Sequence, residues 1–482
     1  MRESGAEMRS VMQKKISLFS AISTGVGMII ATSCFIPLAT GASAVGISFI
    51  FAIVGVCLVN MMAAASVAEL NALMPNLTGG LAQYMLAGVG PMITIVTMIG
   101  GYVISNIFAA PAEGAMFANV MCEFIGGNIP PAVYSVALTI VLVLINLRGI
   151  NMSAIVQTVV ATFMVVSLFI LGFIGMFGLG TGQTVEQEAV LSTDISDIMP
   201  LTVTAFWLFI GSEFIVPIGK DMKNPKRNVP LSMFLSLAIM CVIQIMMVIG
   251  FKNYTVWEEV GAADSPHILY AVNMLGNVGR YWIIIVAILA AVSTQNSIIC
   301  CVSEICCGMA KINLLPALFQ KKNKKGAPYI VLLLMGTCTI IIEATGISSG
   351  NEVAFLILCS SLFWMLAYIV YHINVMVLRK KMKHAPRSFK VALFPLFQVI
   401  GIVVTIYMMC NISTNATERN LIFLISFLFM IAMIIYAFFW CKKRLQMPLL
   451  KNVSIPKIMA MESPMYHTMQ QGLKEKNSID NK

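Results

Sequence analysis

The chain has 482 residues, of which 59% are hydrophobic and 11% are charged, and its formal net charge at pH 7 is +10. A typical soluble domain carries ~25% charged residues, so the composition excludes a soluble enzyme, a disordered chain and a secreted disulfide scaffold. Long uncharged runs, without the alternation of an outer-membrane barrel, predict an all-α polytopic membrane protein.

Twelve stretches are apolar over the ~20 residues that a helix needs to cross the hydrocarbon layer. We therefore predict 12 transmembrane helices joined by short loops. In chain order they are centred on residues 17–40, 44–70, 91–119, 131–147, 153–178, 198–218, 230–251, 280–308, 328–346, 353–378, 391–411 and 420–441.

The basic residues orient these spans. Of the 31 lysines and arginines, only Lys252, Arg280 and Arg419 fall in segments that an even number of spans places outside. Because cytoplasmic loops carry the excess of Lys and Arg, we predict a multi-pass protein of the cell (cytoplasmic) membrane with both termini in the cytoplasm. The positive charge then reflects topology and attraction to anionic lipid headgroups, and we expect no nucleic-acid partner.

The twelve cysteines lie almost entirely inside the predicted spans. Two adjacent pairs, Cys300–Cys301 and Cys306–Cys307, do not have the spacing of the usual zinc sites. We interpret them as small packing residues and expect no metal site and no cofactor.

The first and sixth spans are the irregular ones. Each combines small residues, hydroxyl side chains and a proline, ending at Pro37 in the first and at Pro217 in the sixth. They lie five spans apart, and paired interrupted helices of this kind indicate an inverted-repeat transporter with a site near the bilayer midplane. A half-helix that starts inside the membrane presents free N–H groups to a carboxylate, and one that stops there presents carbonyls to an ammonium group. An α-amino acid carries both a carboxylate and an ammonium group.

Four motifs spread over some 320 residues resemble those of the amino acid–polyamine–organocation (APC) permeases. They are residues 69–80 with Tyr84 and Gly90-Pro91; Phe209-x-Gly211-x-Glu213 with residues 221–230; Ser303 with residues 309–311, Leu315-Pro316 and 326–328; and residues 378–380 with 387–390.

The resemblance implies a LeuT-type fold, a 5+5 inverted repeat with helices 1 and 6 broken, followed by helices 11 and 12. The chain would then divide into a cytoplasmic N-terminal tail (1–15), a ten-helix inverted-repeat transport core (16–379), helices 11–12 (380–444) and a cytoplasmic C-terminal tail (445–482). The last tail is polar, and we expect it to be solvated, with occlusion of the inner mouth as the alternative.

The resemblance also implies a substrate site between helices 1, 3, 6 and 8. Trp207 matches an aromatic residue of helix 6 that gates substrate in arginine/agmatine exchangers, and Asn106 matches a polar substrate contact of helix 3. The stretch Ala31-Thr32-Ser33 replaces a glycine-rich carboxylate cradle, and Met164 stands where some members have a lysine. The predicted substrate-binding residues are Ile30, Ala31, Thr32, Ser33, Asn106, Trp207, Ile210 and Gly211. Simpler interpretations stay open: packing for Trp207, a bond to another helix for Asn106, and bonds to their own helix for Thr32 and Ser33.

Acidic residues inside spans are costly and usually functional. We assign coupling or gating to Glu213, with capping of the broken helix as the alternative. Glu304 is the second coupling candidate, with a boundary residue that reaches water as its alternative, and Trp207 is the gate. Glu113 and Glu343 could carry a proton or contact a cation, or could be boundary residues that reach water. Glu69 is predicted to order a loop.

These patterns favour a permease or antiporter that moves amino acids, or their amine products, by exchange or proton coupling, without enzyme activity. The alternatives are a nontransporting nutrient sensor, a channel of the same fold, and a sodium-coupled transporter of another small solute. The expected partners are the small-molecule substrate and the lipid bilayer; proton coupling and a homodimer are left open.

Overall fold

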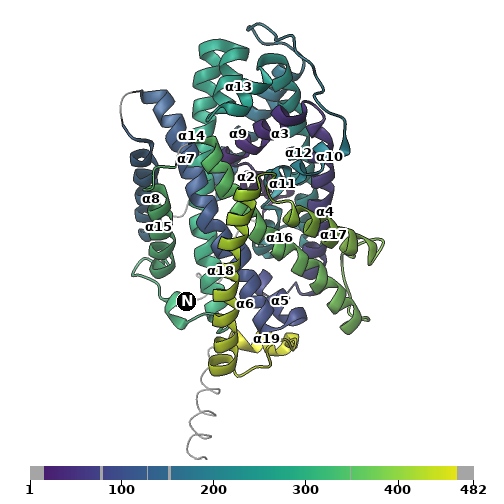
Figure 1. Ribbon diagram of the computed structural model, residues 1–482. Coiled ribbons are helices and arrows are strands. Elements are labelled where there is room, and N and C mark those ends of the chain that lie inside the picture. The colour runs from purple at the N-terminus through teal and green to yellow at the C-terminus, as the bar shows by residue number, and fades with distance from the viewer. Residues whose placement is uncertain are drawn as a thin grey trace, which may run out of the picture.

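The computed structural model describes residues 16–463, except 76, 78–79, 127–128, 150–153 and 348. The described chain is a bundle of helices that run mostly along one direction (Figure 1). Helix α13 (Trp257–Ala262) lies at the top of the view and helix α19 (Ile455–Met461) at the bottom. We call these two ends of the bundle the α13 end and the α19 end.

Eight helical segments of the described chain are long and apolar enough to cross a membrane, and one bent pair of helices meets the same test. The pair is α2 (Leu18–Ile29) and Thr32–Val45, which includes α3 (Phe35–Val45), with an angle of 60° between its halves. The eight segments are Phe49–Leu73 (α4), Pro91–Ile125 (α6, η2 and α7), Thr158–Met176 (in α9), Leu201–Gly219 (α11, η3 and part of η4), Pro225–Tyr254 (α12), Pro266–Lys311 (α14), Gly350–Lys381 (α16) and Ala416–Leu445 (α18 and η6).

Three shorter apolar helices complete the bundle: α8 (Pro131–Leu147), α15 (Tyr329–Glu343) and α17 (Leu396–Cys410). Hydropathy did not predict several short elements outside the spans. These are α5 (Leu81–Val89), α10 (Ile195–Ile198), α13, η5 (Ala317–Gln320) and α19.

Helix α14 is longer than the predicted span 280–308. It begins at Pro266 and contains a kink at Gly276, whose φ of 59° is left-handed. Because glycine alone adopts such a conformation without strain, the chain can bend here and continue as a helix. The prediction of a loop before residue 280 is therefore wrong for residues 266–279, which are part of α14.

Small residues let the first and third spans approach their neighbours closely. A Cβ at Gly27 of α2 would lie 2.7 Å from the Cβ of Ala161 on α9, and one at Gly101 of η2 (Ile99–Ile104) would lie 2.6 Å from the Cβ of Ala367 on α16. Lipid gives no hydrophobic drive between helices, so such close packing supplies much of their association. It fixes the first and third spans against α9 and α16.

A buried ion-pair cluster ties three segments together at the α19 end. The Glu69 carboxylate on α4 accepts hydrogen bonds from Arg379 Nε and Nη2 at 2.7 and 2.5 Å and from the backbone N–H of Val391 at 2.8 Å. Arg387 Nε lies 3.3 Å from the same carboxylate. Glu69 therefore orders the segment after α16, in place of the loop that follows its own helix, and also fastens α4 to α16.

The described part of the C-terminal tail is not a free solvated segment. Val453 N–H donates to the carbonyl of Leu86 on α5, and Met92 N–H of α6 donates to the carbonyl of Leu449. Helix α19 packs on α5. The expectation of a solvated tail is thus wrong for this stretch, because its backbone is hydrogen-bonded to α5 and α6 and α19 packs on α5; residues 1–15 and 464–482 lie outside the described chain.

Candidate functional site

The first span breaks at two residues in extended conformation. Ile30 has φ −70° and ψ 107°, and Ala31 has φ −121° and ψ 144°, between the end of α2 and the start of η1 (Thr32–Cys34). All L-residues reach this region. The break therefore needs no glycine, and this explains how Ala31 can replace a glycine of the family motif.

The backbone groups freed by this break have partners on other helices. The Ile30 carbonyl accepts a hydrogen bond from Thr294 Oγ1 of α14 at 3.0 Å. The N–H groups of Thr32 and Ser33 donate to the two carboxylate oxygens of Glu113 on α7 (Ser105–Ile125), at 3.0 and 3.1 Å. We call these two N–H groups the cradle. Thr32 Oγ1 donates to the Ala287 carbonyl of α14 at 3.1 Å, so its predicted alternative, a bond to its own helix, is wrong.

The sixth span breaks beside the first. Helix α11 (Leu201–Phe206) continues as η3 (Trp207–Phe209), the chain is extended at Ile210, and η4 (Ser212–Asp221) begins after Gly211. Gly211 has φ 122°, and a Cβ there would lie 2.9 Å from the carbonyl oxygen of Met28 on α2. Glycine is required at this position both for its backbone conformation and for the close approach of the two broken helices.

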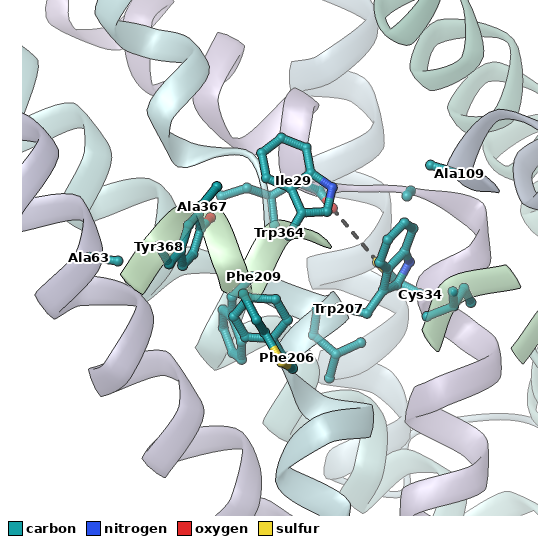
Figure 2. Packing of buried hydrophobic residues seen from close by; sticks show 14 of the residues in the cluster. Ile29, Cys34, Ala63, Ala109, Phe206, Trp207, Phe209, Trp364, Ala367 and Tyr368 are labelled. Atoms are coloured by element: carbon teal, nitrogen blue, oxygen red, sulfur yellow. Dashed lines mark hydrogen bonds between the residues drawn. The ribbon is translucent and has the colours of Figure 1, made fainter. Parts of the chain in front are cut away.

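A small cavity of about 50 Å³ lies between the two breaks. The first, third, sixth, eighth and tenth of the predicted spans contribute to its wall. Figure 2 shows Trp207 and Trp364 here, near Ile29 at the end of α2. The lining residues are Gly27, Met28, Ile29, Ala31, Asn106, Ala109, Glu113, Trp207, Ile210, Gly211, Phe214, Thr294, Ser297, Ile298 and Trp364.

Five of the eight predicted substrate-binding residues line this cavity: Ala31, Asn106, Trp207, Ile210 and Gly211. The other three lie next to it. Ile30 lines a smaller neighbouring cavity, while Thr32 and Ser33 are fully buried behind the wall and hold Glu113.

Trp207 and Asn106 are both anchored by hydrogen bonds at the wall. The Trp207 indole Nε1–H donates to Ser33 Oγ at 2.9 Å and so links the sixth span to the first. Asn106 Nδ2 donates to the carbonyl of Tyr102, one turn earlier in its own span, at 2.7 Å. This hydrogen bond stays within the third span and does not connect Asn106 to another helix. The side chain lies at the cavity wall.

Glu213 lies in the first turn of η4 and is 2% exposed. The hydroxyl of Tyr368 on α16 donates to both of its carboxylate oxygens, at 3.2 and 3.1 Å. The carboxylate thus joins the broken sixth span to α16, immediately behind the cavity-lining Phe214.

The structure places Glu304 away from Glu213. It is an exposed residue of α14 and lines a second cavity of about 270 Å³ together with Lys325. We call this second cavity the vestibule. Met28 and Ser297 line both the vestibule and the central cavity. Glu304 therefore lies in a cavity that adjoins the central one.

Glu113 lies at the site, although its position in the sequence is also compatible with a boundary residue. It is 0% exposed, so its interpretation as a boundary residue that reaches water is wrong. Glu343 is also buried, bound to Thr139 and Gln295, and does not line the cavity. The signal for Glu113 is its spacing, since it follows Asn106 by seven residues and two helical turns place both on one face.

Packing closes the bundle between the cavity and the α13 end. The rings of Phe35 and His267 stack with centroids 4.7 Å apart. Asp264 accepts a hydrogen bond from the N–H of Gly350 at 2.6 Å, which fastens the loop before α14 to the start of α16. The central cavity thus adjoins a vestibule on one side. Towards the α13 end lie the stacked Phe35 and His267 and a separate cavity of about 170 Å³, lined by Asp264 and Gly350, that shares no lining residue with the central one.

Comparison with known proteins identifies the family. The family model described as "Amino acid permease" matches residues 16–439, nearly the whole chain. The chain belongs to the amino acid permease family. It is a multi-pass membrane protein, and the predicted APC resemblance is confirmed.

The chain is similar to several proteins described as permeases or transporters. The branched-chain amino acid permease BcaP of Bacillus subtilis is 21% identical over 86% of this chain and 91% of its own length. The methylthioribose transporter of Bacillus subtilis is 21% identical, with 83% and 89% covered, and the cystine/glutamate transporter of Homo sapiens is 23% identical, with 82% and 79% covered.

The fold is also similar to that of a solved transporter. A structure of the Eremococcus coleocola manganese transporter, in complex with an aromatic bis-isothiourea compound, matches with a TM-score of 0.58 and 14% sequence identity. The match covers 88% of this chain and 94% of the transporter. At this identity the similarity concerns the fold alone.

Proposed function

We propose that this family member is a secondary transporter that moves amino acids, or their amine products, across the cell membrane. The observation that carries the proposal is the cavity between two interrupted helices, lined by Asn106, Trp207 and Gly211. Non-helical backbone at membrane depth is tolerated where it is enclosed by protein or lines a cavity. Two such breaks that meet at one cavity are the arrangement expected of a midplane substrate site.

The proposed architecture is a LeuT-type inverted repeat of five plus five helices, with 12 spans in all and helices 1 and 6 broken. The eight long segments, the bent pair and the three shorter apolar helices support it, since each predicted range overlaps one of them. The core is proposed to cover residues 16–379, helices 11–12 residues 380–444, and the tails 1–15 and 445–482.

We place the α19 end in the cytoplasm, together with both termini. Lys325, Arg379 and Lys442 lie in or beside helix ends there, whereas Glu258 and Glu259 lie on α13 at the opposite end. This distribution agrees with the excess of basic residues in cytoplasmic loops. The vestibule at Glu304 then opens to the cytoplasm.

Transport is proposed to proceed by alternating access around the cavity. The central cavity shares lining residues with the vestibule on the proposed cytoplasmic side and none with the cavity at the α13 end, as an inward-facing state would have. Trp207 acts as the gate because it spans the two broken helices through its bond to Ser33. Transport proceeds by exchange or by proton coupling. Glu213 couples movement of helix 6 to α16 through its hydrogen bond with Tyr368. Glu304 attracts cations at the vestibule.

The names of the relatives support the proposal that the transported substrate is a small organic solute. Their names refer to branched-chain amino acids, cystine and glutamate, and methylthioribose. Amino acids are therefore represented, and the family's solutes also extend beyond them.

The test is uptake of labelled solutes into proteoliposomes that contain the purified full chain, with and without a proton gradient. The panel includes amino acids and their decarboxylated amines. We expect saturable uptake of at least one compound. Flux that rises linearly with concentration would indicate a channel, and binding without any flux would indicate a sensor; either result contradicts the proposal.

Replacing Trp207 with phenylalanine should weaken substrate binding while the aromatic wall is kept. The change removes the N–H donor and leaves Ser33 Oγ without this partner in a buried place. Because the ring that forms the cavity wall is then no longer held against Ser33, we expect the half-saturation concentration for uptake to rise.

Trp282 offers a matched control. Its Nε1–H donates to Ser167 Oγ at 3.1 Å, and it does not line the cavity. Trp282→Phe should leave the half-saturation concentration unchanged. If the two replacements changed the half-saturation concentration equally, the assignment of Trp207 to the substrate site would be contradicted.

A further inference from the structure

The cradle that would hold a substrate carboxylate is occupied by a carboxylate of the protein itself. Both oxygens of Glu113 accept hydrogen bonds from the start of the second half of helix 1, from Thr32 N–H at 3.0 Å and Ser33 N–H at 3.1 Å. An anion at a helix N-terminus is favoured by the exposed N–H groups and by the helix dipole. Glu113 thus satisfies the groups that a free amino acid would need for its own carboxylate.

The other broken helix also has an acidic residue at its start. The half-helix η4 starts inside the bundle and carries Glu213 in its first turn. Its carboxylate is held by Tyr368. Both half-helix starts beside the cavity are therefore provided with acidic side chains of the chain itself.

The cavity has an acidic side chain without a basic partner. Within the described chain, Glu113 lines the cavity and no lysine or arginine does, and no ion pair to Glu113 is formed. A buried carboxylate without a cation is costly, even when it is hydrogen-bonded. A cationic solute in the cavity would supply the missing charge.

Glu113 can receive such a cation without leaving the cradle. An ionised carboxylate offers about four lone-pair positions, and the two cradle bonds use two of them. The rings of Trp207, Phe214 and Trp364 line the same small cavity, and aromatic faces attract ammonium groups. The wall therefore suits an organic ammonium ion next to a fixed carboxylate.

We propose that the transported solute is an organic amine cation without a carboxylate, whose ammonium group pairs with Glu113. This inference rests on the proposed transport function and specifies its substrate class. An α-amino acid would bring a second carboxylate beside Glu113 while both cradle N–H groups are already engaged. Like charges at such close range are strongly unfavourable.

The test is counterflow in proteoliposomes with the full-length protein, using amines paired with their parent amino acids. Suitable pairs are histamine with histidine, tyramine with tyrosine, cadaverine with lysine, and isoamylamine with leucine. Each pair differs by one carboxylate and keeps the rest of the side chain. For at least one pair we expect the amine to be exchanged with an efficiency about 100-fold or more above that of the amino acid.

Two variants locate this preference at Glu113. Glu113→Gln removes the negative charge and should lower amine counterflow about 30-fold, the loss expected for a hydrogen bond to a charged group. Glu113→Ala frees the cradle and should reduce the preference for the amine over the amino acid by at least about tenfold. Glu343→Gln is the matched control, a buried acid outside the cavity, and should retain the wild-type preference.

The outcomes separate this inference from the proposed function. Wild-type protein that exchanges amino acids as well as or better than the paired amines supports transport and overturns the amine assignment. If none of the compounds shows saturable flux, both the amine assignment and the proposed transport function are overturned. Because the wild-type comparison needs no variant, the assignment can be tested even if the Glu113 variants fail to fold.

Discussion

Replacing Gly211 with alanine is expected to lower the rate of counterflow by about 100-fold or more while the protein still inserts into the membrane. Gly211 has φ 122°, a conformation that strains any residue with a Cβ, and strain of this kind costs of order 1–3 kcal/mol. The added Cβ would also lie 2.9 Å from the carbonyl oxygen of Met28, in the backbone of the other broken helix. Both breaks would have to move apart, and the cavity they enclose would change shape.

The control for this replacement is Gly55→Ala. Gly55 lies within α4, and a Cβ there meets no atom within 4 Å. It should transport at the wild-type rate, because alanine favours a helix more than glycine does. Membrane content of both variants is checked by fluorescence size-exclusion chromatography. Wild-type transport by Gly211→Ala would show that the solute does not pass through the junction of the broken helices.

Replacing Glu69 with glutamine is expected to be the most destabilising single change of a charged residue. The carboxylate is 2% exposed and is bound by Arg379 at 2.7 and 2.5 Å, with Arg387 at 3.3 Å. Removing one member of a buried ion pair leaves uncompensated charge and costs about 3–5 kcal/mol. The apparent Tm in detergent, followed by intrinsic fluorescence, should fall by several degrees.

The matched control is the exposed pair of Arg280 and Glu123, whose charged atoms are 3.5 Å apart. Their side chains are 39% and 51% exposed, and exposed pairs contribute about 0–1 kcal/mol. Glu123→Gln should therefore leave the apparent Tm nearly unchanged. Equal melting of the two variants would contradict the role of Glu69 as the fastening between α4 and α16.

The positions of the breaks could be predicted because their cause is local. Small residues, hydroxyls and a proline in the first and sixth spans mark where a membrane helix is interrupted, and the structure has its breaks at Ile30–Ala31 and Ile210–Gly211. The conformations at these breaks differ, since Ala31 is extended and Gly211 is left-handed. That difference could not be read from composition.

The cradle's occupant could not be predicted because it depends on how helices are rotated against one another. Hydropathy identifies α7 and α14 as spans and gives no rotation about their axes. Glu304 was preferred over Glu113 on family resemblance, and the structure places Glu304 in the vestibule and Glu113 at the break. The seven-residue spacing from Asn106 was the available signal.

The short helices outside the membrane spans were missed for a different reason. Helix α5 has 9 residues and α19 has 7, fewer than a span needs, so a search for span-length apolar runs passes over them. Their stability comes from contact with each other and with the loops around them. Such tertiary contacts are not visible in local composition.

The most direct test of the central claim, one alternating-access site at the junction of the two broken helices, is trans-stimulation of solute flux in proteoliposomes. Efflux of a labelled amine is measured with and without unlabelled amine on the opposite side of the membrane. A single site that alternates between the two sides predicts that efflux saturates with concentration and is accelerated by the amine on the opposite side. Efflux that is linear in concentration and unaffected by the opposite side would contradict the account.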